Sequence, residues 1–221
     1  MATPIYRNRQ HAGRALAIRL RAYAGRADVH VLGLPRGGVP VAFEVAQALH
    51  APLGVLVVRK LGVPGHPEYA MGAIAPGVRV LDDALVRRIG LDEAALQQVI
   101  ATEQQELARR ERLYRGDRPP PALQGRTAIL VDDGLATGAT MRAAARALRA
   151  MGPARCVLAV PVAAADTCAA MRQEADEVVC ATTPAPFLSV GHWYDDFSQT
   201  GDDEVRALLA RAASHPMETP L

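Results

Sequence analysis

Short apolar runs alternate with amphipathic segments along most of the chain. Runs with the length of buried strands lie at residues 29–34, 54–58, 128–131, 155–160 and 177–181. Helical spacing of apolar residues is found at residues 7–24, 39–49, 141–151 and 165–174. Strands that alternate with helices favour a parallel sheet with right-handed crossovers. The pattern therefore predicts an α/β fold with a mostly parallel, twisted sheet flanked by helices.

The alternation breaks down in residues 61–77, which are rich in glycine and proline. The stretch is too polar and interrupted for a core element, so it predicts a long loop or a loosely paired hairpin, followed by a short strand at 78–81. Loops of this length in compact domains are usually functional. Helices are then expected at 83–89 and from 93 to about 113. The single apolar stripe of the longer helix, which Asp92 is placed to cap, predicts a position on the surface or against a second subunit.

Composition limits what such a chain can do. Half of the 221 residues are apolar, enough for one α/β core and a small accessory element, so we expect a single domain that closes with a helix near 203–213. The net charge of +2, from 25 basic and 23 acidic residues, leaves no basic stripe for nucleic acid. No eighteen uncharged apolar residues run together, which predicts no membrane span.

The cysteines indicate the compartment. Cys156, Cys168 and Cys180 are odd in number and lack Cys-x-x-Cys spacing. We interpret them as core thiols of a reducing compartment, and expect a cytoplasmic protein with neither a disulfide nor a structural zinc.

The segment 128–148, AILVDDGLATGATMRAAARAL, combines a buried strand, two carboxylates, a loop of small residues and a helix. Asp132 and Asp133 stand where the strand ends, the edge at which open α/β sheets bind ligands. Small residues at 134–140 let backbone N–H groups surround an anion at the start of the helix. Carboxylates suit vicinal hydroxyls or a hydrated Mg²⁺ beside that anion, so the segment predicts a ribose 5-phosphate site.

This segment has two other interpretations. An ordinary strand and loop leading into a capped helix would need no ligand. A P-loop nucleotide site would need a G-x-x-x-x-G-K-[ST] sequence, and the one lysine of the chain, Lys60, has no such loop around it.

A second candidate anion loop is PRGGVP, residues 35–40, which comes after the strand at 29–34 and opens a helix. Gly37 and Gly38 let backbone amides approach an anion, and Arg36 offers a planar fork for a diphosphate. The alternative is a tight glycine turn with a surface arginine.

Two further segments carry candidate site residues. Arg59 and Lys60 come after the strand at 54–58 and precede the expected loop. Three residues of that loop either contact the reacting groups or are loop surface: His66, Glu68 and Tyr69. The alternative interpretation of Arg59 and Lys60 is a solvated basic pair.

Near the C-terminus, the segment 187–197 carries the aromatic residues Phe187 and Trp193 and the acidic residue Asp195.

Together these segments resemble type I phosphoribosyltransferases, whose 5-phosphoribosyl 1-diphosphate (PRPP) motif is an apolar strand leading into two acidic residues and a Thr-Gly-x-Thr loop. The resemblance covers about residues 29–197. PRGGVP, RKLGVPGHPEYAMGA and VDDGLATGAT together look like the bacterial "predicted phosphoribosyltransferase" group, whose acceptor is generally unassigned. The resemblance implies a Mg²⁺-dependent transfer of the phosphoribosyl group from PRPP to a nitrogenous base, or its reverse, in a homodimer.

The resemblance also implies a layout and a set of roles. The core is about 25–181, a small hood is about 182–200 with part of the N-terminus, and 61–77 is a flexible loop that closes over the reacting centre. The implied catalytic residues are Asp132, Asp133, Lys60 and Arg59. The implied 5-phosphate loop is Leu135, Ala136, Thr137, Gly138, Ala139 and Thr140, and the implied pyrophosphate loop is Arg36, Gly37 and Gly38. The implied base contacts are Phe187, Leu188 and Trp193, with Trp193 equally interpretable as core. The implied Mg²⁺ ligands are Asp132, Asp133 and Asp195, mostly through water or PRPP.

Departures from well-known members restrict the acceptor. Ala136 stands where 6-oxopurine enzymes place an acidic residue, and the hood has no lysine to recognise an exocyclic oxygen, which counts against hypoxanthine, guanine and xanthine. The loop also lacks the second lysine usual in orotate enzymes. A non-catalytic PRPP or nucleotide sensor on the same fold is the main alternative. A sugar-phosphate hydrolase is a third, although the chain has no nucleophilic Asp-x-Asp, Cys-x₅-Arg or multi-histidine cluster.

Overall fold

The computed structural model describes residues 4–116 and 118–214, apart from the side chains of residues 67–69. Within these residues, a five-stranded sheet has the order β2-β1-β6-β7-β8, with every neighbouring pair parallel. Its strands are β1 (Val29–Gly33), β2 (Leu53–Val55), β6 (Thr127–Val131), β7 (Arg155–Val162) and β8 (Glu177–Thr182). The expected α/β class and mostly parallel sheet are confirmed.

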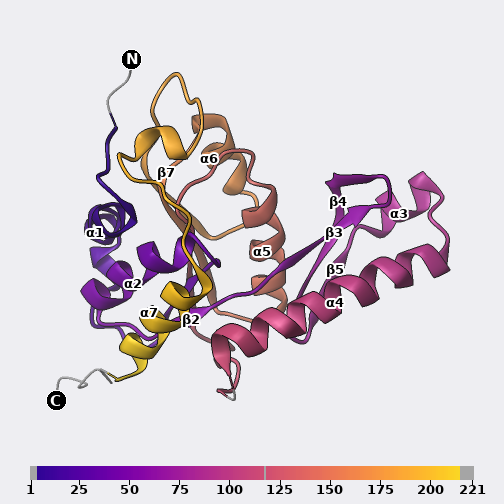
Figure 1. The fold of residues 1–221 in the computed structure, drawn as a ribbon, viewed down its shortest axis with the longest axis horizontal. Coiled ribbons are helices and arrows are strands. Elements are labelled where there is room, and N and C mark those ends of the chain that lie inside the picture. The colour runs from indigo at the N-terminus through magenta and orange to yellow at the C-terminus, as the bar shows by residue number, and fades with distance from the viewer. Residues whose placement is uncertain (1–3, 117, 215–221) are drawn as a thin grey trace.

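Helices cover both faces of this sheet (Figure 1). On one face lie α1 (Arg9–Arg19) and α2 (Gly38–Leu49), and on the other lie α5 (Ala139–Ala150) and α6 (Ala165–Met171). Successive strand residues point to opposite faces. Accordingly, Ile129 packs in the α1 and α2 layer, whereas Leu130 packs in the layer that contains residues of α5 and α6. Burial on both faces explains why the strands are uninterrupted apolar runs.

A second sheet is formed by the segment for which a loop or a hairpin was expected. Strands β3 (Arg59–Val63), β4 (His66–Ala75) and β5 (Val78–Leu81) are antiparallel, in the order β3-β4-β5. Of the two forms expected for 61–77, the loop is wrong and the hairpin is right. Leu61, Met71 and Ile74 are almost completely buried on this sheet, which stabilises it as an extended structure.

Helix α4 (Glu93–Arg115) provides the partner for those residues. Its Leu96, Ile100 and Leu107 belong to the same apolar cluster as the buried side chains of β3 and β4. The helix lies on the surface, one of the two positions expected for it, and its apolar stripe packs against the small sheet. The Asp92 cap is confirmed, since the Ala95 N–H donates to Asp92 Oδ1 over 2.7 Å.

We call the small sheet together with α3 (Asp83–Ile89) and α4 the arm. Figure 1 shows the arm projecting from the main sheet, with α4 running back from its outer end toward α7 (Asp202–Ser214). Two short 3₁₀ turns, Arg21–Tyr23 and Gly191–Trp193, complete the described elements. The closing helix expected near 203–213 is confirmed as α7.

The expectation of three free thiols needs a correction. Cys168 on α6 and Cys180 on β8 form a disulfide, with their Cα atoms 6.5 Å apart, while Cys156 is a buried free thiol. The helix and the strand after it pack side by side, which brings the two cysteines within the span of a disulfide. That proximity arises from packing and has no signature in the spacing of the cysteines.

Thiol titration tests this pairing. Unfolding the oxidised protein in denaturant without a reductant should expose one reactive thiol per chain, that of Cys156, and reduction beforehand should raise the number to three. A Cys168→Ser variant is the matched control, since it leaves two free thiols under both conditions. Three thiols in unreduced wild-type protein would show that Cys168 and Cys180 are not joined.

Candidate functional site

The site is built where β1 and β6 end side by side. The two strands are in register from Val29 opposite Thr127 to Gly33 opposite Val131, so the segments after them emerge together. The Leu34 N–H donates to the carbonyl of Val131 over 2.9 Å and continues this pairing beyond the strand. The PRGGVP loop and the acidic pair, Asp132 and Asp133, are therefore neighbours.

Two glycines let the PRGGVP loop approach the acidic pair. A Cβ on Gly37 would lie 2.0 Å from Asp133 Oδ2, and a Cβ on Gly38 would lie 2.6 Å from the carbonyl oxygen of Val131. The peptide bond between Pro35 and Arg36 is cis. Any side chain at either glycine would have to displace the strand end or the carboxylate, so the sequence keeps the smallest residue at both positions.

The two carboxylates of the acidic pair have defined internal partners. Asp132 Oδ1 accepts the N–H of Asp133 over 2.9 Å, and Asp133 Oδ2 accepts Nε of Arg9 over 2.9 Å and lies 2.9 Å from Nη2 in an ion pair. These contacts use one oxygen of each carboxylate. Within residues 4–116 and 118–214, the second oxygens, Asp132 Oδ2 and Asp133 Oδ1, accept no hydrogen bond.

Burial determines the electrostatics of the pair. It raises the pKa of Asp132 well above its ordinary value, and the neighbouring charge of Asp133 raises that pKa further. Burial also raises the pKa of Asp133, against the lowering effect of the Arg9 guanidinium. Ionisable groups with raised pKa values are found more often at functional sites than elsewhere, so this pair at a strand end is a candidate for one.

The loop at 134–140 leads directly into α5. Leu135 is bridged to the segment after β7, because its N–H donates to the carbonyl of Val162 and its own carbonyl accepts the Ala164 N–H. Thr167 Oγ1 donates to the carbonyl of Ala136 over 2.7 Å, which fixes the middle of the loop. Gly138 adopts φ +76°, a conformation that other residues rarely reach.

The start of α5 is suited to an anion. The helix begins at Ala139, two residues earlier than expected, and no side chain among the described residues caps its first N–H groups. Unsatisfied N–H groups and the positive end of the helix dipole together favour a bound phosphate.

One cleft of about 700 Å³ reaches one end of each anion loop and the basic pair, whereas Asp132 and Asp133 do not line it. Pro35 of the PRGGVP loop, Thr140 at the start of α5, and Arg59 and Lys60 of β3 all line it, and α4 forms a further wall. Arg59 and Lys60 were expected at the end of a strand before a loop, and they lie instead at the start of β3, on the cleft side of the arm. Arg59 Nε donates to Glu103 of α4 over 2.6 Å, which ties the basic pair to that wall.

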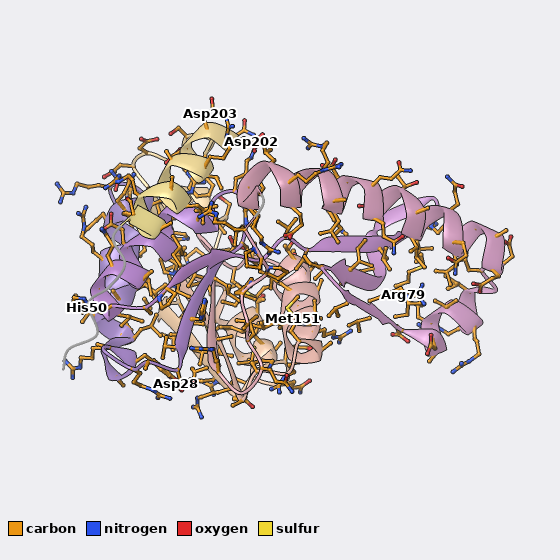
Figure 2. All side chains as sticks on the ribbon, turned by 90° about the horizontal axis from the view of Figure 1, so that it is seen from below. Asp28, His50, Arg79, Met151, Asp202 and Asp203 are labelled. Carbon is orange, nitrogen blue, oxygen red and sulfur yellow. A yellow bond between two sulfur atoms is a disulfide. The ribbon has the colours of Figure 1, made fainter. Side chains whose placement is uncertain are left out.

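Arg36 is held at the edge of the main sheet. Its Nη1 lies 3.8 Å from Asp202 Oδ1, and the Tyr114 hydroxyl at the end of α4 donates to the same oxygen over 2.6 Å. Figure 2 shows Asp202 at the start of α7, close to the end of α4. The side chain of Arg36 is 36% exposed, so solvent reaches it.

The candidate base contacts and the candidate metal ligand of the hood lie partly in the core and partly on the surface. Trp193 is 4% exposed and packs with Tyr6 and Tyr194, so the structure places it in the core rather than on a ligand surface. Phe187 is partly buried against that cluster, while Leu188 is 64% exposed. Asp195 is exposed, and its position beside the N-terminal segment is fixed by a hydrogen bond from its N–H to the carbonyl of Tyr6.

Sequence reasoning missed two residues that contact the acidic pair. Arg9 was expected only as part of an amphipathic helix, and Tyr194 had no assigned role, yet the Tyr194 hydroxyl donates to the carbonyl of Asp133 over 2.6 Å. Arg9 and Tyr194 are 124 and 61 residues away from Asp133 in sequence. The aromatic run around Tyr194 was the only local signal.

Comparison with known proteins gives consistent matches. A family model described as "Phosphoribosyl transferase domain" matches residues 2–196. Two Mycobacterium tuberculosis proteins, "Putative phosphoribosyl transferase Rv0571c" of strain H37Rv and "Putative phosphoribosyl transferase MT0597" of strain CDC 1551, are 55% identical over 209 residues. The match covers 94% of this chain and 47% of each relative, so the chain spans about half the length of these relatives.

A solved structure matches over nearly the whole chain. The protein TT1426 from Thermus thermophilus superposes with a TM-score of 0.85 at 43% identity, covering 93% of this chain and 98% of that one. In the part of the chain that the structure describes, no helix is long and apolar enough to cross a bilayer.

Proposed function

Because the chain belongs to the phosphoribosyl transferase domain family, we propose that it transfers the 5-phosphoribosyl group of PRPP to a nitrogenous base, or runs the reverse reaction with pyrophosphate. The observation that carries this proposal is a cleft lined by Pro35, Thr140, Arg59 and Lys60. It brings Pro35 at one end of the PRGGVP loop, Thr140 at the end of the candidate 5-phosphate loop and the basic pair of the arm to one place, which suits a diphosphate-bearing ribose.

Each part of PRPP has a matching surface. The uncapped start of α5 and the loop 135–140 suit the 5-phosphate, because their N–H groups converge without bulky side chains. The second oxygens of Asp132 and Asp133 suit the ribose hydroxyls, which are hydrogen-bond donors. Backbone groups at Gly37 and Gly38, with the fork of Arg36, suit the pyrophosphate.

The proposed reaction is a nucleophilic substitution at C1 of the ribose. A bond forms between the acceptor nitrogen and C1 while the bond from C1 to the pyrophosphate oxygen breaks, and the electron pair leaves with pyrophosphate. Positive charge develops on the ribose ring, where the buried carboxylates of Asp132 and Asp133 can stabilise it. The protein supplies position and charge without forming a covalent bond to the substrate.

The residues present fit a magnesium ion that is held mainly by substrate. The described residues contain no group of three or more His, Cys, Asp or Glu that could hold a metal by itself. Mg²⁺ is commonly bound by one or two carboxylates together with water and substrate phosphates. Asp132 and Asp133 would hold it in that way, whereas Asp195 does not group with them and would meet a second ion. When bound, the ion would neutralise charge on the departing pyrophosphate.

The test is pyrophosphate release from PRPP and Mg²⁺ with a panel of purine, pyrimidine and pyridine bases, measured against a control without base. Release that depends on one base would identify both the reaction and the acceptor. Binding of PRPP without release for any base would favour a sensor of PRPP or nucleotides on the same fold. Absence of PRPP binding would contradict the proposal at its first step.

A further inference from the structure

Arg9 connects the acidic pair with the hood and the N-terminus. It is the first residue of α1. Its Nε donates to Asp133 Oδ2 over 2.9 Å, and its Nη2 lies 2.9 Å from the same oxygen in an ion pair. The third nitrogen, Nη1, donates to the carbonyl of Ser198 over 2.6 Å, and the guanidinium carbon lies 4.0 Å from the ring centre of Phe197. All three guanidinium nitrogens and one guanidinium face are therefore engaged.

The surroundings of Arg9 restrict it to one position. The N–H groups of Asp195 and Asp196 donate to the carbonyls of Tyr6 and Arg7, at 2.8 and 2.9 Å, and attach the hood to the chain just before α1. Only 11% of the Arg9 side chain is exposed, against 62% for Arg14 on the same helix. The conformation of such a buried arginine side chain is determined by its protein contacts rather than by solvent.

The contact also determines which carboxylate oxygen is free. Arg9 and the tight approach of Gly37 both occupy the Oδ2 side of Asp133, since a Cβ on Gly37 would lie 2.0 Å from that oxygen and 3.2 Å from Arg9 Nε. Oδ2 is therefore unavailable to a ligand. The opposite oxygen, Oδ1, remains as the acceptor that Asp133 can offer.

We propose that Arg9 is a positioning residue for ribose recognition: by holding Asp133 Oδ2 against the PRGGVP loop, it aims Oδ1 at a ribose hydroxyl. This inference rests on the proposed function, because it assigns a ribose to the acidic pair. Arg9 does not contact the sugar itself. It acts through Asp133. Because Arg9 also contacts Ser198 and Phe197 of the hood, the orientation of the Asp133 carboxylate depends on the position of the hood.

The experiment measures hydroxyl recognition separately from phosphate binding. Dissociation constants are determined by calorimetry for ribose 5-phosphate, 2-deoxyribose 5-phosphate and inorganic phosphate, with wild type, Arg9→Met, Arg9→Lys and the control Arg14→Met. A hydrogen bond from a hydroxyl to a charged acceptor corresponds to about 10- to 100-fold in affinity. Wild type and Arg14→Met should prefer the ribose compound by about that factor. Arg9→Met should reduce the preference to about threefold or less, with phosphate binding unchanged, and Arg9→Lys should lie between.

A double-variant cycle shows whether Arg9 acts through Asp133. In an Asp133→Asn background, Arg9→Met should cause little further loss of ribose preference, because residues that act as one unit are not additive. The inference would be overturned if Arg9→Met kept the wild-type preference for ribose 5-phosphate over 2-deoxyribose 5-phosphate, or if it weakened the binding of inorganic phosphate as much as that of ribose 5-phosphate. Neither result would contradict the proposed function. If Arg9→Met does not fold, Arg9→Lys decides, and an unchanged preference there overturns the inference. Failure of wild type to bind ribose 5-phosphate or PRPP would instead remove the proposed function.

Discussion

Replacing Asp132 and Asp133 together by asparagine is expected to lower pyrophosphate release from PRPP by about 10³-fold or more. Removal of one preorganised electrostatic group commonly reduces kcat by about 10² to 10³, and here two charges facing the ribose are lost. Asparagine has nearly the same shape as aspartate, so the loss should reflect charge rather than packing. The rate is measured at saturating PRPP and Mg²⁺ with the base identified in the panel.

The exposed neighbours Asp203 and Glu204 provide a matched control. They are adjacent carboxylates on α7, and Figure 2 shows Asp203 on the outer surface of the molecule. An Asp203→Asn, Glu204→Gln variant removes the same charge and should retain the wild-type rate. Wild-type turnover in the Asp132→Asn, Asp133→Asn variant would refute the catalytic assignment of the acidic pair.

Although the Asp132→Asn change is expected to impair activity, it is not expected to lower the thermal stability of the protein. Burial raises the pKa of Asp132 above its value in the unfolded chain, so ionised Asp132 lowers the stability of the folded state at neutral pH. Asp132→Asn alone should therefore leave Tm unchanged or raise it. The site would then carry a carboxylate for function at the expense of stability.

The main sheet could be predicted because its strands are buried on both faces. The run at 128–131 is fully buried as part of β6, and apolar runs of that kind are recognised without knowledge of any partner. The sequence also predicted that Gly37 and Asp132 lie at the same end of the sheet, because both come after strands of one parallel sheet; the adjacency of β1 and β6 was seen only in the structure. The residues at a strand's carboxyl end can be placed from local sequence once the sheet is known.

The arm could not be predicted in this way. Its strand β4 contains Gly72, where a Cβ would lie 2.3 Å from the carbonyl oxygen of Val80. The close contact between β4 and β5 therefore requires glycine, and glycine within a segment weakens the sequence pattern by which a strand is recognised. Its buried side chains depend on α4, which comes later in the chain. A strand stabilised by a distant helix has no complete signal in its own sequence.

The same reasoning applies to the site. Arg9 and Asp133 meet only because α1 packs beside the sheet and the hood folds over it, and an arginine in an amphipathic helix carries no mark of such a partner. The disulfide between Cys168 and Cys180 likewise results from the packing of α6 on β8. Motif residues were predictable, whereas the residues that orient them were not.

Replacing Gly37 by alanine is expected to reduce pyrophosphate release by about 10²-fold, the effect of misplacing a reacting group by about 1 Å. The backbone is not the obstacle, because Gly37 has φ −61° and ψ −30°, which alanine adopts readily. The added methyl would meet Asp133 Oδ2 at 2.0 Å, so the carboxylate must turn away from Arg9. Gly201→Ala is the matched control, since nothing lies within 4 Å of a Cβ there, and it should retain the wild-type rate.

Stability measurements separate the steric cause from a general defect. Gly37→Ala should lower Tm by several degrees, since inserting one methyl into a tight contact costs about 1 to 3 kcal/mol and each kcal/mol corresponds to about 2 to 4 °C in a chain of this size. In an Asp133→Ala background the methyl meets no carboxylate, so the same change should no longer lower Tm, while activity stays absent. A loss of Tm that persists in that background would mean that Gly37 is required by the fold and not by the carboxylate it faces.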